Sequence, residues 1–506
     1  MSSPETSTTV TKPPLEHLRA DAVALVGVIF MALATAAPIT AMTGNLPVII
    51  GSGNGVHAPV GFIFVTLVLT VFTVGYVAMA RHITTAGAFY SYISHGLGRI
   101  IGMASGLLAV LAYVVFEASI AGIFAYFAET AIDSQFGVNV PWQWLAVFML
   151  LVTSVLTHYD IKVAAKILGV FLVGEVVMLT LLAGSVLAHG GGPHGFHFSV
   201  LNPTGAFAGV NAGVGLFFCF WSWIGFESTA MYGEESRNPK RIIPLATLFA
   251  VVGLGVLYTF VSWMVLSSNG PQDAVEIASG ITPLDLFLDP AQQYLGHWAV
   301  TALLWLMVTS SFACAMAFHQ CASRYLYAIG RERFLPPALG HVHPRYRSPS
   351  VASLTQTGIA LAIVLIFWGT GQDPYVGLYT LTAILGTLSL LVVQTLCSFS
   401  VIAYFRRNHP ESRHWFRTFT APLLGGLGML AAIGLLLANL HKAAGPAADL
   451  LFFRFIPWIV AAVFLSGIAL ALYMRSKYPE KYKVMGRIVL ESTTASDTRK
   501  PLSTRT

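Results

Sequence analysis

Three glutamates lie inside long apolar stretches of the sequence: Glu117, Glu175 and Glu227. A charged side chain at the centre of a membrane-spanning helix costs about 2.5 to 3.5 kcal/mol on insertion scales, so such residues usually face the interior of a bundle. A carboxyl group shielded from water favours its protonated form, which allows it to exchange a proton near neutral pH. We therefore predict that Glu227, Glu175 and Glu117 act in proton coupling or gating. For Glu117 and Glu175 the alternative is a neutral acid that forms hydrogen bonds between helices.

Two of the apolar stretches also contain residues that weaken a helix at its centre. Pro38 lacks an N–H donor and clashes with the preceding turn, and Gly225 lowers the free-energy cost of non-helical backbone. Backbone groups freed at membrane depth must bind protein, water or a ligand. The N-terminus of a half-helix attracts a carboxylate and the carbonyls at a C-terminus attract an ammonium, so a zwitterionic amino acid would satisfy both. The predicted substrate-binding residues in these stretches are Ala34, Thr35, Ala36, Ala37, Pro38, Ile39, Trp221, Ser222, Trp223, Ile224 and Gly225.

The elements that must position these residues are membrane-spanning helices. Of the 506 residues 56% are hydrophobic and 10% charged, whereas an average soluble domain has about 25% charged residues. Apolar runs long enough to cross a hydrocarbon core of about 30 Å predict an all-α polytopic protein with twelve spans. We place the spans near 22–50, 59–80, 100–128, 142–158, 163–188, 207–232, 242–267, 298–326, 350–369, 375–404, 418–440 and 454–474.

The two interrupted stretches fall in the first and sixth predicted spans. Five spans form an odd-numbered unit, so a second unit of five begins on the opposite side of the membrane and becomes an inverted copy of the first. Matching interruptions in two inverted halves indicate a transporter site near the midplane. A simple kink at each position is the alternative, because Pro and Gly are common in membrane helices.

Positive charges predict the orientation of the chain. All of the 28 Lys and Arg residues except Lys442 and Arg454 fall in segments on one side of the predicted spans. Short cytoplasmic loops retain such residues, so both termini are expected in the cytoplasm. This bias also explains the net charge of +6 without a nucleic acid partner.

No cofactor or metal is expected from the sequence. The four cysteines all lie inside predicted spans and lack the spacing of a disulfide framework or a zinc site, so we interpret them as small apolar side chains. The segments 1–20 and 481–506 are rich in polar residues and are interpreted as cytoplasmic tails, the first of them disordered.

Three motifs resemble those of the amino acid/polyamine/organocation permeases. The segment 85–92, Thr-Ala-Gly-Ala-Phe-Tyr-Ser-Tyr, is similar to a small-residue and tyrosine motif of the family. Gly225-Phe226-Glu227, followed by Glu234-Glu235 and by Asn238-Pro239-Lys240-Arg241-Ile242-Ile243-Pro244, is similar to the exit of the family's sixth span. The segment 323–328, Ser-Arg-Tyr-Leu-Tyr-Ala, is similar to the start of an inner loop.

The resemblance implies a secondary transporter and not an enzyme. Its transport core would cover 21–404, with inverted repeats at about 21–188 and 207–404, discontinuous helices 1 and 6, and two peripheral helices within 405–480. The sixth span is especially similar to that of arginine/agmatine antiporters. By this similarity Trp221 would cover the substrate, Ile224 would offer it backbone groups, and Glu227 would act in gating or proton linkage.

The first span departs from the family pattern. Many members have Gly-x-Gly at this break, where bare backbone holds the substrate carboxylate, whereas this chain has Ala36-Ala37-Pro38. Amines and polyamines therefore remain candidates beside amino acids. The resemblance implies that the third helix lines the site, so Glu117 is expected to bind a cationic substrate. Tyr113 is expected either to contact that cation through its ring or to pack against neighbouring helices. His319 is expected to form an interhelical hydrogen bond.

These features predict a permease of the cell (inner) membrane that moves amino acids or related amines by alternating access and is linked to protons. Alternatives are a polyamine or amino acid/amine antiporter and, from another class, a channel or a transporter-like sensor. The expected partners are the small-molecule substrate, protons and membrane lipids, and the chain is expected to be a monomer or a homodimer.

Overall fold

A computed structural model describes most of the chain. The described residues are 24–83, 87–158, 161–193, 195–209, 211–232, 236–344, 346, 348–439 and 451–486. The predicted tail 1–20, most of the predicted tail 481–506, Lys442, and the motif residues Glu234 and Glu235 lie outside them.

Helices form the whole of the regular structure among the described residues, as the predicted all-α class requires. The α-helices are α1 (Leu25–Ala36), α2 (Pro38–Val48), α3 (Ala58–Ala80), α4 (Ala88–Gly96), α5 (Arg99–Phe136), α6 (Trp142–His158), α7 (Ile161–Ala188), α8 (Ala212–Trp221), α9 (Pro239–Asn269), α10 (Pro271–Ser279), α11 (Asp285–Tyr294), α12 (His297–Arg331), α13 (Ser350–Gly369), α14 (Thr380–Arg407), α15 (Ala421–Ala438), α17 (Leu451–Lys477) and α18 (Pro479–Val484). Single π-helical turns are η1 (Ile49–Gly53), η7 (Pro374–Tyr379) and η9 (Phe416–Thr420). The 3₁₀ segments are η2 (Gly55–His57), η3 (Phe198–Leu201), η4 (Pro203–Phe207), η5 (Phe226–Tyr232), η6 (Pro337–Gly340) and η8 (Pro410–Ser412).

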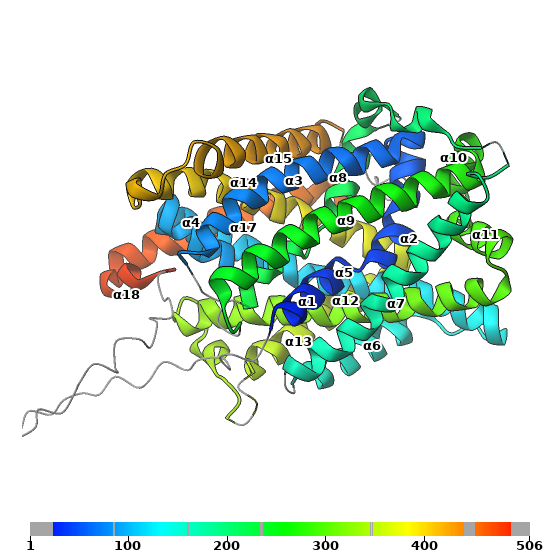
Figure 1. Cartoon of the computed structure of the whole chain (residues 1–506). Coiled ribbons are helices and arrows are strands. Elements are labelled where there is room, and N and C mark those ends of the chain that lie inside the picture. Colours follow the sequence, from blue (N-terminus) through cyan, green and yellow to red (C-terminus); the bar gives the residue numbers. More distant parts are fainter. Residues whose placement is uncertain are drawn as a thin grey trace, which may run out of the picture.

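Ten helical stretches of the described chain are long and apolar enough to cross a membrane. The remaining two predicted spans correspond to α6, which has 17 residues, and to the interrupted run of α8 and η5. The long helices lie side by side along one direction, with α10 and α11 at one end and α4 and α18 at the other (Figure 1). The chain is therefore a multi-pass membrane protein.

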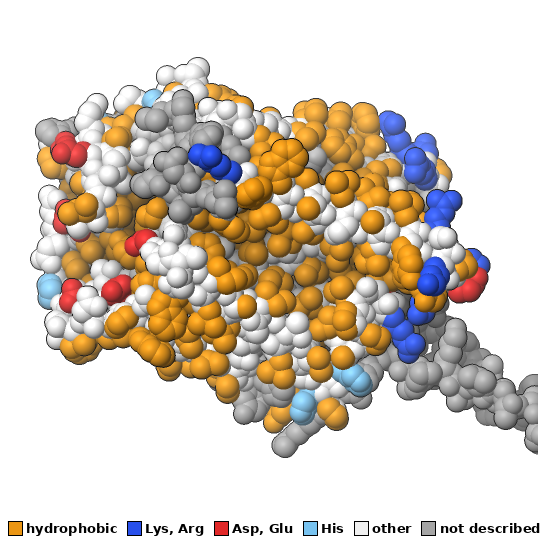
Figure 2. Space-filling model, turned by 180° about the vertical axis from the view of Figure 1, so that it is seen from behind, with side chains coloured by type: hydrophobic (Ala, Val, Ile, Leu, Met, Phe, Trp, Pro, Cys, Tyr) orange, Lys and Arg blue, Asp and Glu red, His pale blue; other side chains and the backbone are white. Residues whose placement is uncertain are grey.

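Side chains on the outer surface match this arrangement. An apolar belt covers the middle of the molecule, Lys and Arg gather at one end, and most of the visible Asp and Glu lie at the other (Figure 2). The Lys and Arg end is the end that carries α18. Charge is thus excluded from the zone that hydrocarbon would surround.

The first predicted break separates α1 from α2. Ala37 has the left-handed conformation (φ 44°, ψ 77°), and Pro38 is the first residue of α2. Proline suits this position because its fixed φ fits a helix and its missing N–H has no intrahelical partner there.

The second predicted break separates α8 from η5. α8 ends at Trp221, a turn follows, and Gly225 has φ 120°. α5 lies in the centre of the molecule, where it packs against α4, α12, α14 and α17.

Candidate functional site

The two helix breaks touch each other. A Cβ atom at Gly225 would lie 2.6 Å from Thr35 Cβ and 2.9 Å from the Ala36 nitrogen. Such contacts are shorter than real Cβ contacts, and φ 120° is also unfavourable for any other residue. Glycine at 225 is therefore required for the sixth span to approach the first.

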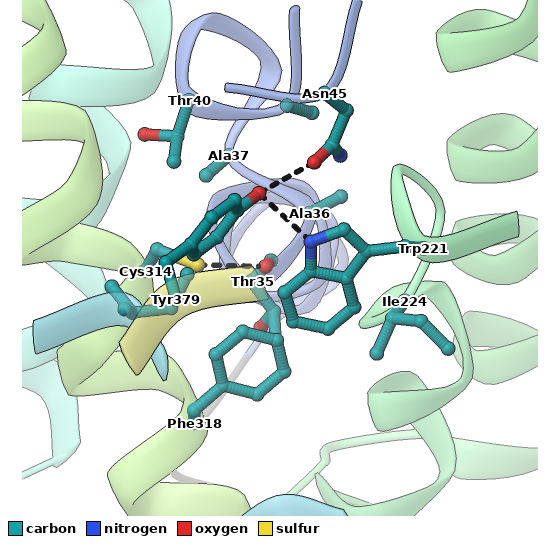
Figure 3. Close-up of a pocket in the computed structure, with 12 residues that line it drawn as sticks. Thr35, Ala36, Ala37, Thr40, Asn45, Trp221, Ile224, Cys314, Phe318 and Tyr379 are labelled. Carbon is teal, nitrogen blue, oxygen red and sulfur yellow. Dashed lines mark hydrogen bonds between the residues drawn. The ribbon is translucent and has the colours of Figure 1, made fainter. Parts of the chain in front are cut away.

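A small pocket of about 20 Å³, which is room for about one water molecule, lies between the breaks (Figure 3). Its lining combines hydroxyl groups, one amide and several aromatic rings, and no lining side chain carries a formal charge at neutral pH. The lining residues are Thr35, Ala36, Ala37, Thr40, Ala41, Asn45, Ile120, Trp221, Ile224, Cys314, Phe318 and Tyr379.

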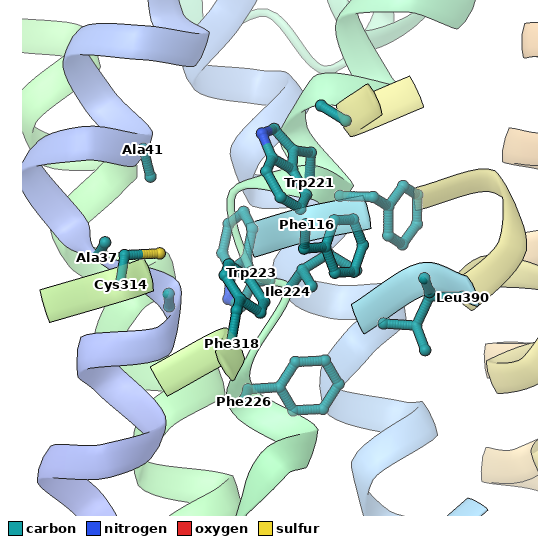
Figure 4. Close-up of a cluster of buried hydrophobic side chains, with 14 of the residues drawn as sticks. Ala37, Ala41, Phe116, Trp221, Trp223, Ile224, Phe226, Cys314, Phe318 and Leu390 are labelled. Carbon is teal, nitrogen blue, oxygen red and sulfur yellow. The ribbon is translucent and has the colours of Figure 1, made fainter. Parts of the chain in front are cut away.

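Aromatic rings form one wall of the pocket. The Trp221 ring stacks on the Phe318 ring with 6.0 Å between the ring centroids. The Phe116 ring of α5 also contacts Trp221, with 4.6 Å between the centroids (Figure 4). This wall offers π faces to a cation or packing to an alkyl group.

A set of hydrogen bonds closes the pocket on one side. Trp221 Nε1 donates to the Tyr379 hydroxyl (2.9 Å), which in turn donates to Asn45 Oδ1. Asn45 Nδ2 donates to Ser222 Oγ (2.9 Å), so both broken helices and η7 are joined. Tyr375 stacks on Tyr379 at 5.7 Å.

Beyond this closure lies a wider cavity of about 440 Å³. Tyr375 lines it together with residues of the α10 end, including Ala278 and Ile281. The pocket is thus separated from a large opening, at the end of the molecule opposite the Lys and Arg cluster, by the layer of Tyr375, Tyr379 and Trp221.

Glu227 is buried immediately after the second break. Its Oε1 accepts a hydrogen bond from the Tyr113 hydroxyl (2.6 Å), and its Oε2 accepts one from the Gly225 N–H (3.1 Å). Its main-chain carbonyl accepts a hydrogen bond from the Tyr76 hydroxyl (2.8 Å). The carboxyl group therefore ties the broken helix to α5. Tyr113 bonds to Glu227 and does not line the pocket.

Glu175 of α7 is buried against the first break. Its Oε2 accepts a hydrogen bond from the Ile39 N–H (3.3 Å), whereas no described residue hydrogen-bonds to its Oε1. The neighbouring Thr40 N–H donates to Ser310 Oγ of α12 (3.4 Å). The start of α2 is thus covered by side chains of two other helices.

Glu117 belongs to a separate buried network. His319 Nδ1 lies 3.0 and 3.1 Å from its two carboxylate oxygens, and Gln356 Nε2 donates to Oε2 (2.6 Å). His319 Nε2 lies 2.7 Å from Ser353 Oγ, so α5, α12 and α13 are joined and the expected interhelical bond of His319 is present. The structure does not bring Glu117 to the pocket, because its oxygens face these partners.

The other predicted substrate-binding residues divide into two groups. Thr35, Ala36, Ala37, Trp221 and Ile224 line the pocket. The rest flank it without lining it, namely Ala34, Pro38, Ile39, Ser222, Trp223 and Gly225. The Trp223 ring points instead to α9, where its Nε1 donates to the Val251 carbonyl (3.1 Å).

A comparison with protein families identifies the chain. The amino acid permease family model matches residues 24–465, which is nearly the whole described chain. The chain belongs to the amino acid permease family. It is accordingly a membrane transporter and not an enzyme, as the motifs predicted.

Three relatives of this permease are 23% to 26% identical to it over the aligned regions. An uncharacterized transporter of Rhizobium meliloti is 26% identical over 65% of this chain and 68% of its own length. The low-affinity putrescine importer PlaP of Escherichia coli is 24% identical over 83% of this chain and 88% of its own. The branched-chain amino acid permease BcaP of Bacillus subtilis is 23% identical over 79% of this chain and 83% of its own length.

Sequence reasoning missed several residues that line the pocket of the permease. Asn45 lies seven residues after Pro38, two helical turns along one face, so its polarity in an apolar run was a usable signal. Cys314 was interpreted as an apolar side chain, yet its Sγ donates to the Thr35 carbonyl (3.1 Å) at the pocket. Tyr379 and Phe318 carried no local signal, because aromatic residues in membrane helices usually serve packing.

Metal binding has no candidate among the described residues. No group of three or more His, Cys, Asp or Glu side chains converges there in a way that could hold an ion.

Proposed function

We propose that this permease carries an amino acid or a related amine across the cell (inner) membrane by alternating access linked to protons. The observation that carries the proposal is the closed pocket between the two interrupted helices. The names of the relatives, which include a putrescine importer and a branched-chain amino acid permease, support an amine-bearing substrate.

Alternating access requires that the pocket open to one side at a time. On the side of the wide cavity it is closed by Trp221, Tyr379 and Asn45. On the other side Glu227 and Tyr113 join η5 to α5, and Tyr113 stacks on Tyr325 at 5.4 Å. We interpret the first layer as the outer gate and the second as the inner gate.

Glu227 is the proposed proton carrier of the inner gate. An ionised carboxylate accepts hydrogen bonds at both oxygens, whereas a protonated one turns one oxygen into a donor. Gain of a proton would turn these charge-assisted hydrogen bonds into neutral ones, which are about half as strong, and would thereby favour separation of η5 from α5. Glu175, with its unpartnered Oε1, is a second proposed proton site.

The proposed topology follows the charge distribution and the paired breaks. Both termini lie in the cytoplasm, and the segments 21–188 and 207–404 form inverted repeats of a transport core. Two peripheral helices within 405–480 complete the chain, which functions as a monomer or homodimer surrounded by lipid.

Transport by proteoliposomes tests the proposal. Purified full-length protein is reconstituted, and uptake of labelled amino acids, putrescine and agmatine is measured with and without an imposed pH gradient. We expect saturable uptake of at least one compound that falls when the pH gradient is collapsed. Vesicles preloaded with unlabelled substrate show whether exchange is faster than net uptake, as an antiporter requires.

Glu227→Gln is the matched test of the proton carrier. It keeps the size of the side chain but cannot exchange a proton, so we expect uptake to lose its response to the pH gradient and to fall by about tenfold or more. Glu276→Gln, on exposed α10, is the control and should behave as wild type. Full proton-driven uptake by Glu227→Gln would contradict the assigned role, and a strict sodium requirement would contradict proton coupling itself.

A further inference from the structure

The first break leaves no backbone N–H free to bind a substrate carboxylate. The Ala37 N–H donates to the Leu33 carbonyl (2.9 Å), and the Ala41 N–H donates to the Ala37 carbonyl (2.8 Å). Pro38 has no N–H. The two that remain, of Ile39 and Thr40, donate to Glu175 and to Ser310.

The acceptor at the start of α2 is therefore supplied by the protein. A helix N-terminus attracts negative charge because its first N–H groups are unpaired and its dipole is positive there. Glu175 is fully buried and comes from α7, 136 residues away in sequence from its partner Ile39. It occupies the Ile39 donor of this half-helix, beside the pocket that Ile39 flanks.

The backbone N–H groups at the second break also have acceptors within the protein. The Gly225 N–H donates to Oε2 of Glu227, and the N–H groups of Ser222, Trp223 and Ile224 donate to carbonyls of the preceding turn. A substrate carboxylate would thus find no free donor at this break among those four residues.

The pocket itself offers acceptors and π faces. The carbonyls of Thr35 and Ala36 lie at the end of α1, where the helix dipole is negative. Each accepts one hydrogen bond, from Cys314 Sγ and from the Tyr258 hydroxyl, and keeps a second lone pair for a ligand. Trp221, Phe318 and Tyr379 present aromatic rings (Figure 3), and no lysine, arginine or histidine lines the pocket to pair with an anion. Such a site suits an ammonium group, and a carboxylate in it would be buried without partners.

We propose that Glu175 is an internal replacement for the substrate carboxylate, so that the permease selects small amines that lack a carboxylate over the corresponding amino acids. This inference rests on the proposed function, because it names the substrate class of the same pocket. Glu175 is in this account a specificity-determining residue that acts by occupying the donors of α2.

Matched pairs that differ by one carboxylate test the inference. Binding of isobutylamine and valine, of 3-methylbutylamine and leucine, of agmatine and arginine, and of putrescine and ornithine is measured on the full-length protein by thermal shift, and exchange is measured in proteoliposomes. In at least one pair we expect the amine to bind about tenfold more tightly than the amino acid. In no pair should the amino acid bind more tightly than the amine.

Two variants of Glu175 separate the effect of its charge from the effect of its hydrogen bond to the Ile39 N–H. Glu175→Gln retains an oxygen that can accept from the Ile39 N–H, so the preference for amines should persist. Glu175→Ala frees that donor and leaves space beside it, so the preference should shrink at least about threefold. Formate should stabilise Glu175→Ala against heat and leave wild type unchanged, because it refills the vacated position. Thr180→Ala, exposed on the same helix, is the control and should match wild type in every measurement.

The outcomes distinguish this inference from the proposed function. If an amino acid binds the wild-type protein as tightly as its amine or more tightly, the inference is wrong and the proposed transport stands. If no member of any pair is bound or exchanged, both are wrong. If Glu175→Ala does not fold, the wild-type pairs and Glu175→Gln still decide the matter.

Discussion

At the scale of single residues, the contact between the two breaks depends on one missing side chain. Gly225 touches Thr35 and Ala36, and its φ of 120° is open to glycine alone at low cost. A methyl group there would have to displace α1, because the atoms it meets include backbone. Close approach of the first and sixth spans is therefore encoded at this position.

Gly225→Ala should destabilise the protein and abolish transport. Overpacking and backbone strain each contribute about 1 to 3 kcal/mol, and both act here. Thermal denaturation in detergent and uptake by proteoliposomes measure the two effects. Gly184→Ala on α7 is the control, since nothing lies within 4 Å of its added Cβ and alanine favours a helix. Equal melting temperatures for the two variants would contradict the steric argument.

The buried pair of Glu117 and His319 supports the fold away from the pocket. Removal of one partner leaves the other buried without its main contact, which typically costs about 3 to 5 kcal/mol. Glu117→Ala and His319→Ala should each lower the melting temperature, and the double variant should lose less than the sum of the two. Exposed Asp133→Ala, on the same helix as Glu117, provides the control. Strict additivity would show that the two side chains do not interact energetically.

At the scale of elements, the proposed outer gate is a contact between α2, α8 and η7. Each supplies one polar group to a chain of hydrogen bonds: Asn45, Trp221 and Tyr379. The three segments are far apart in sequence, so motion of any one of them breaks the chain. This makes the gate a natural place for the pocket to open toward the wide cavity.

Tyr379→Phe should loosen the outer gate and leave the fold intact. It removes two hydrogen bonds, each worth about 0.5 to 1.5 kcal/mol, and keeps the ring. Substrate should be released more readily, so the apparent affinity in uptake should fall about five- to a hundredfold, while the melting temperature should fall by no more than a few degrees. Tyr473→Phe, half-exposed on α17, is the control. Wild-type affinity in Tyr379→Phe would show that these bonds do not hold the gate.

At the scale of the whole molecule, charge divides the permease into two ends and an apolar belt. The Lys and Arg end carries α18, and the acidic end carries α10 and α11. From the positive-inside bias we propose that the Lys and Arg end faces the cytoplasm.

Cysteine labelling in intact cells tests this orientation. The four native cysteines are buried, so background reaction with a membrane-impermeant maleimide should be low. Ile281→Cys, at a position that is 98% exposed, should react from outside, and Ser412→Cys should react after the membrane is permeabilised. The opposite pattern would invert the topology.

The sequence by itself determined the membrane class, the location of both helix breaks and the three buried acids. Apolar length, Pro38, Gly225 and isolated glutamates are local properties of the chain, and their free-energy cost in lipid does not depend on what packs beside them. These features sufficed to predict a multi-pass membrane protein with a transporter site and part of the lining of its pocket, and the resemblance of three motifs added the permease family.

The partners of the acids were decided by the tertiary structure. The bonds of Glu175 to Ile39, of Tyr113 to Glu227 and of Glu117 to His319 join residues 136, 114 and 202 positions apart. Buried membrane helices are apolar all round, so no stripe of hydrophobic residues shows which face meets which neighbour. Rotation and packing of whole helices therefore placed Tyr379 at the pocket, turned Glu117 away from it and set Glu175 at the start of α2.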